Sequence, residues 1–157
     1  MELILWRHAQ AQDLTDDMPA EADMQRPLTA KGQKQAQRMG GWLESALPQT
    51  CRILVSPSLR TQETAEALGR KFKTLAEIGP AASAEDLILA ANWPHSREPV
   101  LLIGHQPALG AMAAQLIKPQ QSECAIRKAN VWWISQKEMD GEGLQTYLKA
   151  IMCPQLA

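Results

Sequence analysis

Residues 100–107 read Val-Leu-Leu-Ile-Gly-His-Gln-Pro, and this stretch is the strongest indication of the class of fold. The run at its start is apolar at every position, which predicts a strand buried on both faces, as in the centre of a parallel sheet. His105 follows this run after one glycine, and Pro107 is placed to open a helix. The stretch therefore predicts a strand that passes into a helix, as in α/β proteins, with a titratable side chain at the strand's carboxyl end.

Two other apolar runs end in a similar way. Leu3-Ile4-Leu5-Trp6 is followed by Arg7 and His8, and Ile53-Leu54-Val55 is followed by Ser-Pro-Ser-Leu and then Arg60. Ligands of open α/β sheets bind at the carboxyl ends of the strands. We therefore expect a group of cationic and titratable side chains to meet at one edge of the sheet: Arg7, His8, Arg60 and His105.

The rest of the chain alternates strands with helices and then closes on a pair of strands. Strands are predicted at residues 2–6, 51–55, near 75, at 100–103, 129–135 and 146–152, with a hairpin loop over 136–143. Helices are predicted from an N-cap at Thr29 to Leu47, from a Ser56-Pro57 cap to Phe72, from a capped start at Ser83 to Trp93, and from Pro107 onward. This order favours a three-layer α/β/α architecture, with a mostly parallel central sheet and an antiparallel strand. The length of 157 residues predicts a single domain over residues 1–157.

Composition and charge restrict the classes of function. The formal net charge is −1, so no overall field favours nucleic acid or an anionic membrane. No run approaches the ~20 apolar residues of a membrane span, and no signal-peptide pattern opens the sequence. Its 3 widely spaced cysteines are typical of free thiols in a reducing compartment. We therefore expect a cytoplasmic protein with no nucleic-acid or membrane partner, whose positive site is local.

Several other chemistries lack their motifs in this sequence. A P-loop, a dinucleotide-binding Gly-x-Gly-x-x-Gly and a Gly-x-Ser-x-Gly elbow are all absent. The 3 histidines have no metal-ligand spacing, and no cysteine cluster joins them. We therefore expect neither a metal nor a cofactor.

The clustered arginines and histidines suit phosphoryl transfer. Catalysis of this reaction depends on positioning and on stabilising charge over three equatorial oxygens, which the planar forks of Arg7 and Arg60 match. Imidazole has an unperturbed pKa of ~6.5, so His8 is the candidate nucleophile and would form a phosphohistidine. His105 is predicted to donate a hydrogen bond to the transferring oxygens. Its charge stays open, because the arginines disfavour the imidazolium and a bound dianion favours it.

Each signal also has a structural explanation. An Arg-His pair after a strand, a Ser-Pro-x-x-Arg helix start and a Gly-His-x-Pro turn are all common features of proteins that bind nothing there. The acidic loop over 9–26 is a solvated surface, a docking site for a basic partner, or a source of a proton. Joint placement at three strand ends is what favours the phosphate pocket.

At these residues the chain resembles the histidine phosphatase superfamily, also called the phosphoglycerate mutase-like family. Arg7-His8-Ala9 is similar to its Arg-His-Gly signature, and Arg26-Pro-Leu-Thr-Ala-Lys-Gly32 is similar to the segment that opens its first helix. Residues 56–65 and 104–107 are similar to its second and third blocks. Length and the Arg-Pro-Leu-Thr segment most resemble the short, SixA-type branch of phosphohistidine phosphatases.

The resemblance implies a phosphoglycerate mutase-like fold and a metal-independent phosphatase. Its substrate would be a phosphohistidine-bearing protein, such as a phosphorelay domain in signal transduction. By matching position, the resemblance implies a phosphate pocket of Arg7, His8, Arg60 and His105, with His8 as nucleophile and Arg26 as a further substrate contact. Two rival functions stay open: a phosphatase for a small phosphomonoester metabolite, and a non-catalytic module that binds phosphorylated proteins.

Two departures from the family pattern bear on the chemistry. Ala9 stands where the signature has glycine, and we expect alanine to fit there. Larger members place a glutamate after the second block as proton donor, and Glu77 is the nearest candidate in this chain. An alkoxide leaving group needs a proton in the transition state, whereas imidazole leaves readily. A site without a strong acid should therefore favour phosphohistidine over sugar phosphates.

Overall fold

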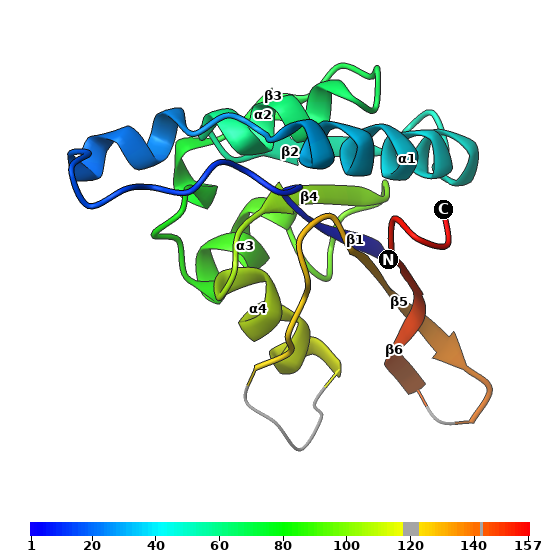
Figure 1. The fold of residues 1–157 in the computed structure, drawn as a ribbon. Helices are drawn as coiled ribbons and strands as arrows, with labels where there is room; N and C mark the ends of the chain where they lie inside the picture. Colours follow the sequence, from blue (N-terminus) through cyan, green and yellow to red (C-terminus); the bar gives the residue numbers. More distant parts are fainter. Residues whose placement is uncertain (118–122, 142) are drawn as a thin grey trace.

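The computed structural model describes residues 1–117, 123–141 and 143–157. The elements in chain order are β1 (Glu2–Arg7), η1 (Ala20–Gln25), α1 (Ala30–Ala46), β2 (Arg52–Val55), α2 (Leu59–Glu66), β3 (Lys73–Thr74), η2 (Ala76–Ile78), α3 (Ala84–Ala91), β4 (Val100–Gly104), α4 (Ala108–Ile117), β5 (Val131–Met139) and β6 (Gly143–Met152). Helices α1 and α2 cover one face of the sheet, and α3 and α4 cover the other (Figure 1). The predicted three-layer α/β/α architecture is confirmed.

The sheet has the strand order β3-β2-β4-β1-β5-β6. Strands β3, β2, β4 and β1 pair in parallel, and β5 runs antiparallel to β1. Strand β4 lies between β2 and β1, and every one of its residues is buried, as an apolar run in a central strand requires. The mostly parallel sheet with an antiparallel strand is therefore confirmed.

The core has one apolar layer on each side of the sheet, because successive strand residues point to opposite faces. In β1, Ile4 and Trp6 pack in the layer with α1 and α2, and Leu3 and Leu5 pack in the layer with α3 and α4. All of these side chains are fully buried. The chain leaves β1 toward α1 on one face, whereas it leaves β4 into α4 on the other. The neighbouring carboxyl ends of β1 and β4 therefore form a crevice of the kind where α/β proteins bind ligands.

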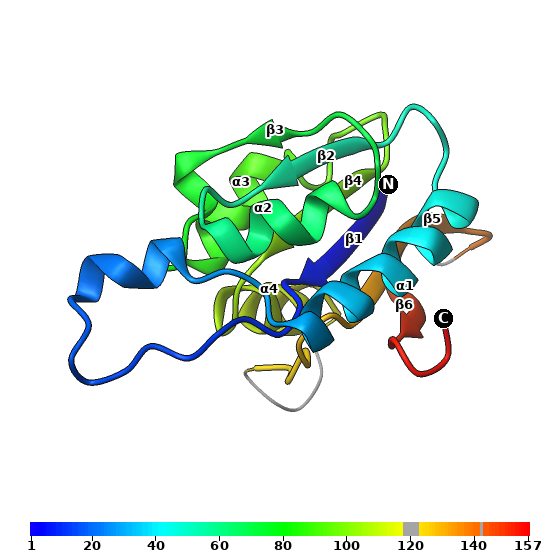
Figure 2. The same cartoon turned by 45° about the horizontal axis from the view of Figure 1, so that its top comes forward.

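Between β1 and α1 the chain makes a long excursion beyond the sheet, which we call the arm (residues 12–26). It runs outward and returns through η1 to the start of α1 (Figure 2). The predicted helix cap at Thr29 is confirmed, since its hydroxyl accepts a hydrogen bond from the Gly32 N–H. The capped start predicted at Ser83 is also confirmed, and Ser83 and Asp86 form a capping box there.

The predicted start and end of the second helix are wrong. Helix α2 begins at Leu59 after Ser58, not at Pro57, because Ser56 takes part in other contacts. The Ser56 carbonyl accepts hydrogen bonds from the side chains of Thr61 and Gln62, and the Ser56 hydroxyl is hydrogen-bonded to the ring of His105. The helix ends at Glu66, well before Phe72, and Gly69 follows in a left-handed conformation that takes the chain away from the helix axis.

The predicted loop over residues 136–143 is also wrong for most of its length. Strand β5 continues to Met139 and pairs with β6 from Gly143, with Gln136 opposite Thr146. This end of the hairpin is largely exposed, so its sequence carries no alternation of apolar and polar residues. Asp140 and Gly141 form the turn on the described side, and residue 142 lies outside the described residues.

The cysteines Cys51, Cys124 and Cys153 are free thiols, as their spacing predicts. Among the helices that the structure describes, none combines the length and the apolar character that crossing a membrane requires.

Candidate active site

The two predicted site histidines lie side by side at the carboxyl edge of the sheet. Arg7 at the end of β1 pairs with Gly104 at the end of β4, and the His8 N–H donates to the Gly104 carbonyl over 3.1 Å. His8 and His105 thus follow neighbouring strands, and their ring centroids are 5.3 Å apart. Both side chains are buried. Residues almost a hundred positions apart therefore meet because two parallel strands end together.

The ring of His8 has a defined orientation. Its Nδ1 lies 2.8 Å from the Ala9 carbonyl, and a carbonyl can only accept, so Nδ1 carries the proton. In the neutral ring, Nε2 is then left with a free lone pair. Burial lowers the pKa of His8 to about 3, and the charges of Arg60 and Arg7 act in the same direction. His8 is therefore a neutral imidazole at physiological pH.

His105 is held from its other side by serines. Its Nε2 lies 2.7 Å from the Ser56 hydroxyl and 3.4 Å from that of Ser58, and its Nδ1 lies 3.4 Å from a terminal nitrogen of Arg60. Since guanidinium only donates, Nδ1 accepts there and Nε2 donates to Ser56. Burial lowers the pKa of His105 to about 3, and the charge of Arg60 acts in the same direction. His105, whose charge the sequence left open, is thus neutral in this arrangement.

The two arginines approach the histidines from different elements. Arg60 comes from the first turn of α2 and is only 4% exposed, whereas Arg7 is the last residue of β1 and donates to the Ile126 carbonyl over 2.9 Å. The Nε–H groups of both arginines are buried without a hydrogen-bond partner among the described residues. Each of these two cations therefore keeps a buried donor without a partner in the described chain.

A single pocket of about 540 Å³ contains the whole predicted constellation. The predicted residues that line it are Arg7, His8, Arg26, Arg60 and His105. Asp13 and Leu14 of the arm, together with Lys128, also line this pocket, and the sequence did not single them out. Among the residues that the structure describes, no group of three or more His, Cys, Asp or Glu side chains could hold a metal ion.

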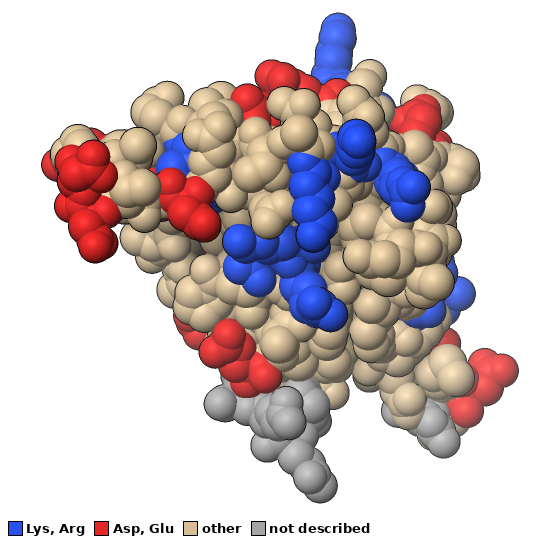
Figure 3. Space-filling model, in the orientation of Figure 1, with Lys and Arg blue, Asp and Glu red and all other residues tan. Residues whose placement is uncertain are grey.

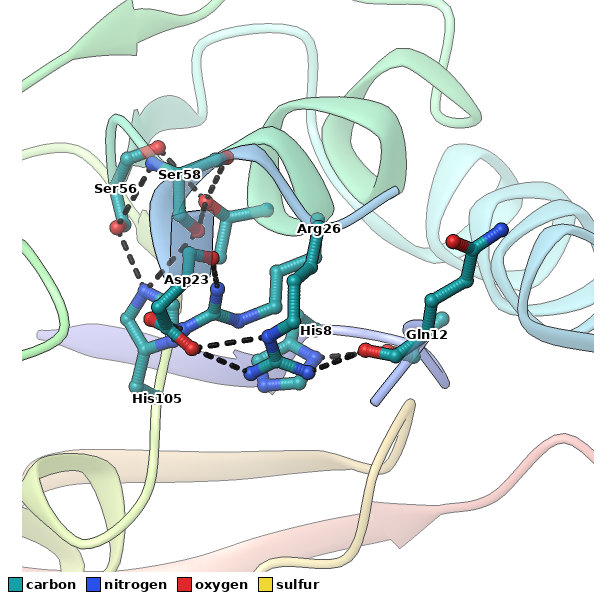
Figure 4. Close-up of polar contacts among 10 residues, drawn as sticks. His8, Gln12, Asp23, Arg26, Ser56, Ser58 and His105 are labelled. Atoms are coloured by element: carbon teal, nitrogen blue, oxygen red, sulfur yellow. Dashed lines mark hydrogen bonds and ion pairs between the residues drawn. The ribbon is translucent and has the colours of Figure 1, made fainter. Parts of the chain in front are cut away.

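Asp23, on η1 of the arm, bridges two of the site arginines (Figure 4). One carboxylate oxygen accepts from Arg26 Nε over 2.9 Å, and the other accepts from Arg60 Nη2 over 3.0 Å. Burial raises the pKa of Asp23, but hydrogen bonds and charges from Arg26 and Arg60 outweigh this and lower it overall. Arg26 also donates to the Gln12 carbonyl over 2.6 Å. Sequence reasoning grouped Asp23 with the other acidic loop residues, and only its position three residues before Arg26 hinted at a local pair.

The chain that follows His8 is fixed by close packing. The Ala9 N–H donates to the Thr64 hydroxyl over 3.1 Å, and Ala9 is not among the residues with positive φ, so alanine fits as expected. Helix α1 begins directly against this segment: a Cβ on Gly32 would lie only 1.9 Å from the Gln10 carbonyl oxygen. Glycine is therefore required at position 32 for this approach.

The structure places Glu77, the proton-donor candidate, outside the pocket that contains His8. Glu77 is exposed and lines a separate hollow beside Pro80. The carboxylate that does line the pocket with His8 is Asp13, an exposed residue of the arm.

The fold and the site define the class of protein, and comparison with known sequences agrees. The model of the histidine phosphatase superfamily (branch 1) matches residues 3–82. This chain belongs to that superfamily, which supports a phosphatase.

Its relatives include phosphohistidine phosphatase SixA of Escherichia coli (strain K12), with 30% identity over 124 residues that cover 74% of either chain. A SixA homolog of Haemophilus influenzae is 31% identical over 131 residues, which cover 74% of this chain and 77% of the relative. The solved structure of protein histidine phosphatase SixA complexed with tungstate superimposes with a TM-score of 0.74 at 25% identity, covering 99% of this chain and 98% of that one. The phosphoglycerate mutase-like fold is thus confirmed.

Proposed function

We propose that this chain is a metal-independent phosphohistidine phosphatase, which removes the phosphoryl group from a histidine of a partner protein. The observation that carries this proposal is the state of His8: a buried, neutral imidazole with an unprotonated Nε2, in a pocket shared with two arginines and a second histidine. The names of its SixA relatives, phosphohistidine phosphatases, favour the same substrate.

The reaction has two displacements at phosphorus. The substrate's imidazole takes a proton from water on its other nitrogen, the lone pair on Nε2 of His8 attacks the phosphorus, and the imidazole leaves neutral as its P–N bond breaks. Water then attacks the phosphorus of phosphorylated His8, the P–N bond breaks, and inorganic phosphate leaves with His8 restored. The first step moves the phosphoryl group from one nitrogen to another, and the second moves it from nitrogen to the oxygen of water.

Arg7 and Arg60 stabilise the charge on the phosphoryl oxygens in both steps. His105 assists from Nδ1, the nitrogen that lies toward Arg60. A bound dianion favours a proton on this nitrogen, and Nε2 can then accept from the Ser56 hydroxyl instead of donating to it. Ser56 serves both forms of the ring, because a hydroxyl both donates and accepts.

Imidazole as the leaving group distinguishes this proposal from a phosphomonoesterase. Among the described residues that line the pocket, the one carboxylate belongs to Asp13, and this side chain is exposed. A general acid contributes typically 10²–10⁴-fold to ester cleavage, so its lack weighs against sugar phosphates. The exposed Asp13 is the one observation in favour of the rival function, hydrolysis of a small phosphomonoester.

Substrate preference and trapping test the proposal together. We expect the wild type to hydrolyse a phosphohistidine peptide with a kcat/KM at least ~100-fold above that for glucose 6-phosphate, and to keep this activity in EDTA. Preference for the sugar phosphate would instead establish the monoesterase. Alkaline or rapid quenching with labelled substrate should trap phosphate on His8, and His8→Ala should lose turnover. Persistent turnover by His8→Ala would refute the mechanism, and binding without any turnover would identify a phosphoprotein-binding module.

A further inference from the structure

A group of exposed cations lies beside the catalytic pocket. Lys31, Lys34 and Arg38 recur at three- and four-residue spacing, so they share one side of α1. Arg127 and Lys128 stand in the segment that precedes β5, and all of these side chains are exposed. In Figure 3, blue side chains extend from the region of α1 toward the middle of this face of the molecule. We call these residues the basic face: Lys31, Lys34, Arg38, Arg127 and Lys128.

The basic face is continuous with the catalytic pocket. One hollow of about 450 Å³ is lined by Lys31, Arg127 and Lys128, and a neighbouring hollow of about 290 Å³ is lined by Lys31, Lys34 and Arg38. Lys128, together with Arg7, lines both the first hollow and the pocket of His8. Within the described parts of the chain, no Asp or Glu lines either hollow. A positively charged surface thus leads from α1 to the proposed nucleophile.

No salt bridge within the described chain pairs these cations with an acid. The salt bridges of residues 1–117, 123–141 and 143–157 involve Arg26, Arg60, Arg70 and Lys149, and none involves the basic face. Like charges three and four residues apart on a helix repel one another. Their concentration beside the pocket therefore disfavours the folded chain slightly and favours an anionic partner.

The opposite side of the pocket mouth has the reverse charge. The arm carries exposed acids at Asp13, Asp16, Asp17 and Glu21, and Asp13 lines the pocket itself. A nucleic acid that crossed the mouth would meet this arm with its own negative charge and be repelled. A protein surface can instead place carboxylates on only one side of its phosphorylated residue. Such a surface meets the basic face with its acidic side and the arm with its other side.

We propose that the basic face docks an acidic surface of the partner protein, next to the phosphohistidine that enters the pocket. This inference rests on the proposed function, since it assigns the partner of the same site. The acidic side of the partner lies over the start of α1, and the arm prevents the reversed orientation. Because exposed charges act over roughly 10 Å at 0.1 M salt, the docking accelerates encounter and weakens as salt is added.

Two synthetic phosphohistidine peptides and phosphoramidate, a substrate too small to reach Lys31 and Lys34 from the pocket, test the proposal. One peptide has Asp and Glu around the phosphohistidine, and the other has Asn and Gln at the same positions. The test variant is Lys31→Glu/Lys34→Glu. The control variant is Arg97→Glu/Lys137→Glu, which has the same change in charge at exposed positions near the amino-terminal ends of β4 and β1. Thermal unfolding followed by circular dichroism checks that both variants fold.

For the acidic peptide at low salt, we expect the test variant to lose about tenfold or more in kcat/KM. Its turnover of phosphoramidate and of the neutral peptide should be unchanged, the control variant should behave as wild type, and 0.5 M salt should remove the difference. Equal losses for both peptides, equal losses in both variants, or no loss at all would overturn the docking proposal. An oligonucleotide could instead bind the wild type more tightly than the acidic peptide does and fail to bind the test variant. That result would assign the basic face to nucleic acid and overturn the docking proposal.

Failure of the proposed function would be visible separately. A wild type that hydrolyses neither phosphoramidate nor either peptide refutes the phosphohistidine phosphatase. Fluorescence anisotropy with the unphosphorylated acidic peptide then tests the basic face alone. Binding that is weakened by Lys31→Glu/Lys34→Glu and kept by the control supports an acidic partner, and lack of binding to the wild type overturns it.

Discussion

The carboxylate of Asp23 lies 3.0 Å from the guanidinium of Arg60, so an acid of the arm contacts an arginine proposed to bind phosphate. Its second oxygen contacts Arg26, which lines the same pocket. Carboxylate and phosphate compete for the same kind of donor geometry. The arm is thereby tied to the site through the residues that a substrate must also use.

Asp23→Asn should strengthen the binding of anions. The substitution removes one negative charge beside Arg60, and the partial exposure of Asp23 limits the gain to ~1 kcal/mol. We expect the inhibition constant of inorganic phosphate to fall by about fivefold. Asp17→Asn, on the exposed part of the arm, is the matched control and should leave the constant unchanged. A weaker inhibition by phosphate in Asp23→Asn would show that the arm positions Arg60 instead of competing for it.

Stability should fall in mild acid because of the two buried histidines. The pKa of His8 and of His105 is about 3 in the folded chain, against 6.5 as the ordinary value. Between these values the unfolded chain binds more protons than the folded chain, so the free energy of unfolding decreases as the pH falls from about 6.5 toward 3. Each histidine should contribute a loss of about 2 kcal/mol between pH 7 and pH 5.

Urea unfolding at these two pH values measures this loss. In His105→Asn, the drop between pH 7 and pH 5 should be smaller than in the wild type by about the share of one histidine. His95→Asn is the control, since His95 is exposed in a loop, and its drop should match the wild type. An unchanged drop in His105→Asn would mean that His105 is protonated in the folded chain.

Ser56→Ala should reduce kcat more than it raises KM. The Ser56 hydroxyl, 2.7 Å from Nε2, holds the ring of His105 without lining the pocket itself. Loss of one such hydrogen bond contributes ~1 kcal/mol, so we expect kcat on a phosphohistidine peptide to fall by about fivefold to tenfold. Ser58→Ala removes the longer contact of 3.4 Å and should have the smaller effect. A larger effect of Ser58→Ala would show that Ser58, not Ser56, positions the ring of His105.

Gly32→Ala should destabilise the chain, whereas Gly41→Ala should stabilise it. A Cβ at position 32 would lie 1.9 Å from the Gln10 carbonyl oxygen, and a Cβ at position 41 would meet nothing within 4 Å. Both glycines lie within α1, so the helix propensity favours alanine by ~0.5–1 kcal/mol at each. Overpacking against backbone at position 32 costs more, typically 1–3 kcal/mol. Chemical denaturation should give opposite signs for the two variants, and equal signs would contradict the close approach of α1.

Local signals in the sequence were sufficient for the main features of the fold. The apolar run at residues 100–103 predicted a central strand, and this strand lies between β1 and β2 with every residue buried. The caps at Thr29 and Ser83 were also predicted correctly, because a cap involves only residues three positions apart. Prediction failed at Ser56, whose hydroxyl has a partner 49 positions away. It also failed in the hairpin of β5 and β6, where exposure on both sides removes the alternating pattern.

For the site, the strand pattern was sufficient to predict which side chains meet: Arg7, His8, Arg60 and His105 each lie at or just after the carboxyl end of a buried parallel strand, and such strands end at one edge of the sheet. How these side chains are held depends on the tertiary structure. The proton on Nδ1 of His8, the serines behind His105 and the contact of Asp23 with Arg60 all depend on hydrogen bonds whose geometry the strand pattern does not fix. Most of these bonds join separate elements, and the path of an irregular loop such as the arm is set by the surfaces it packs on.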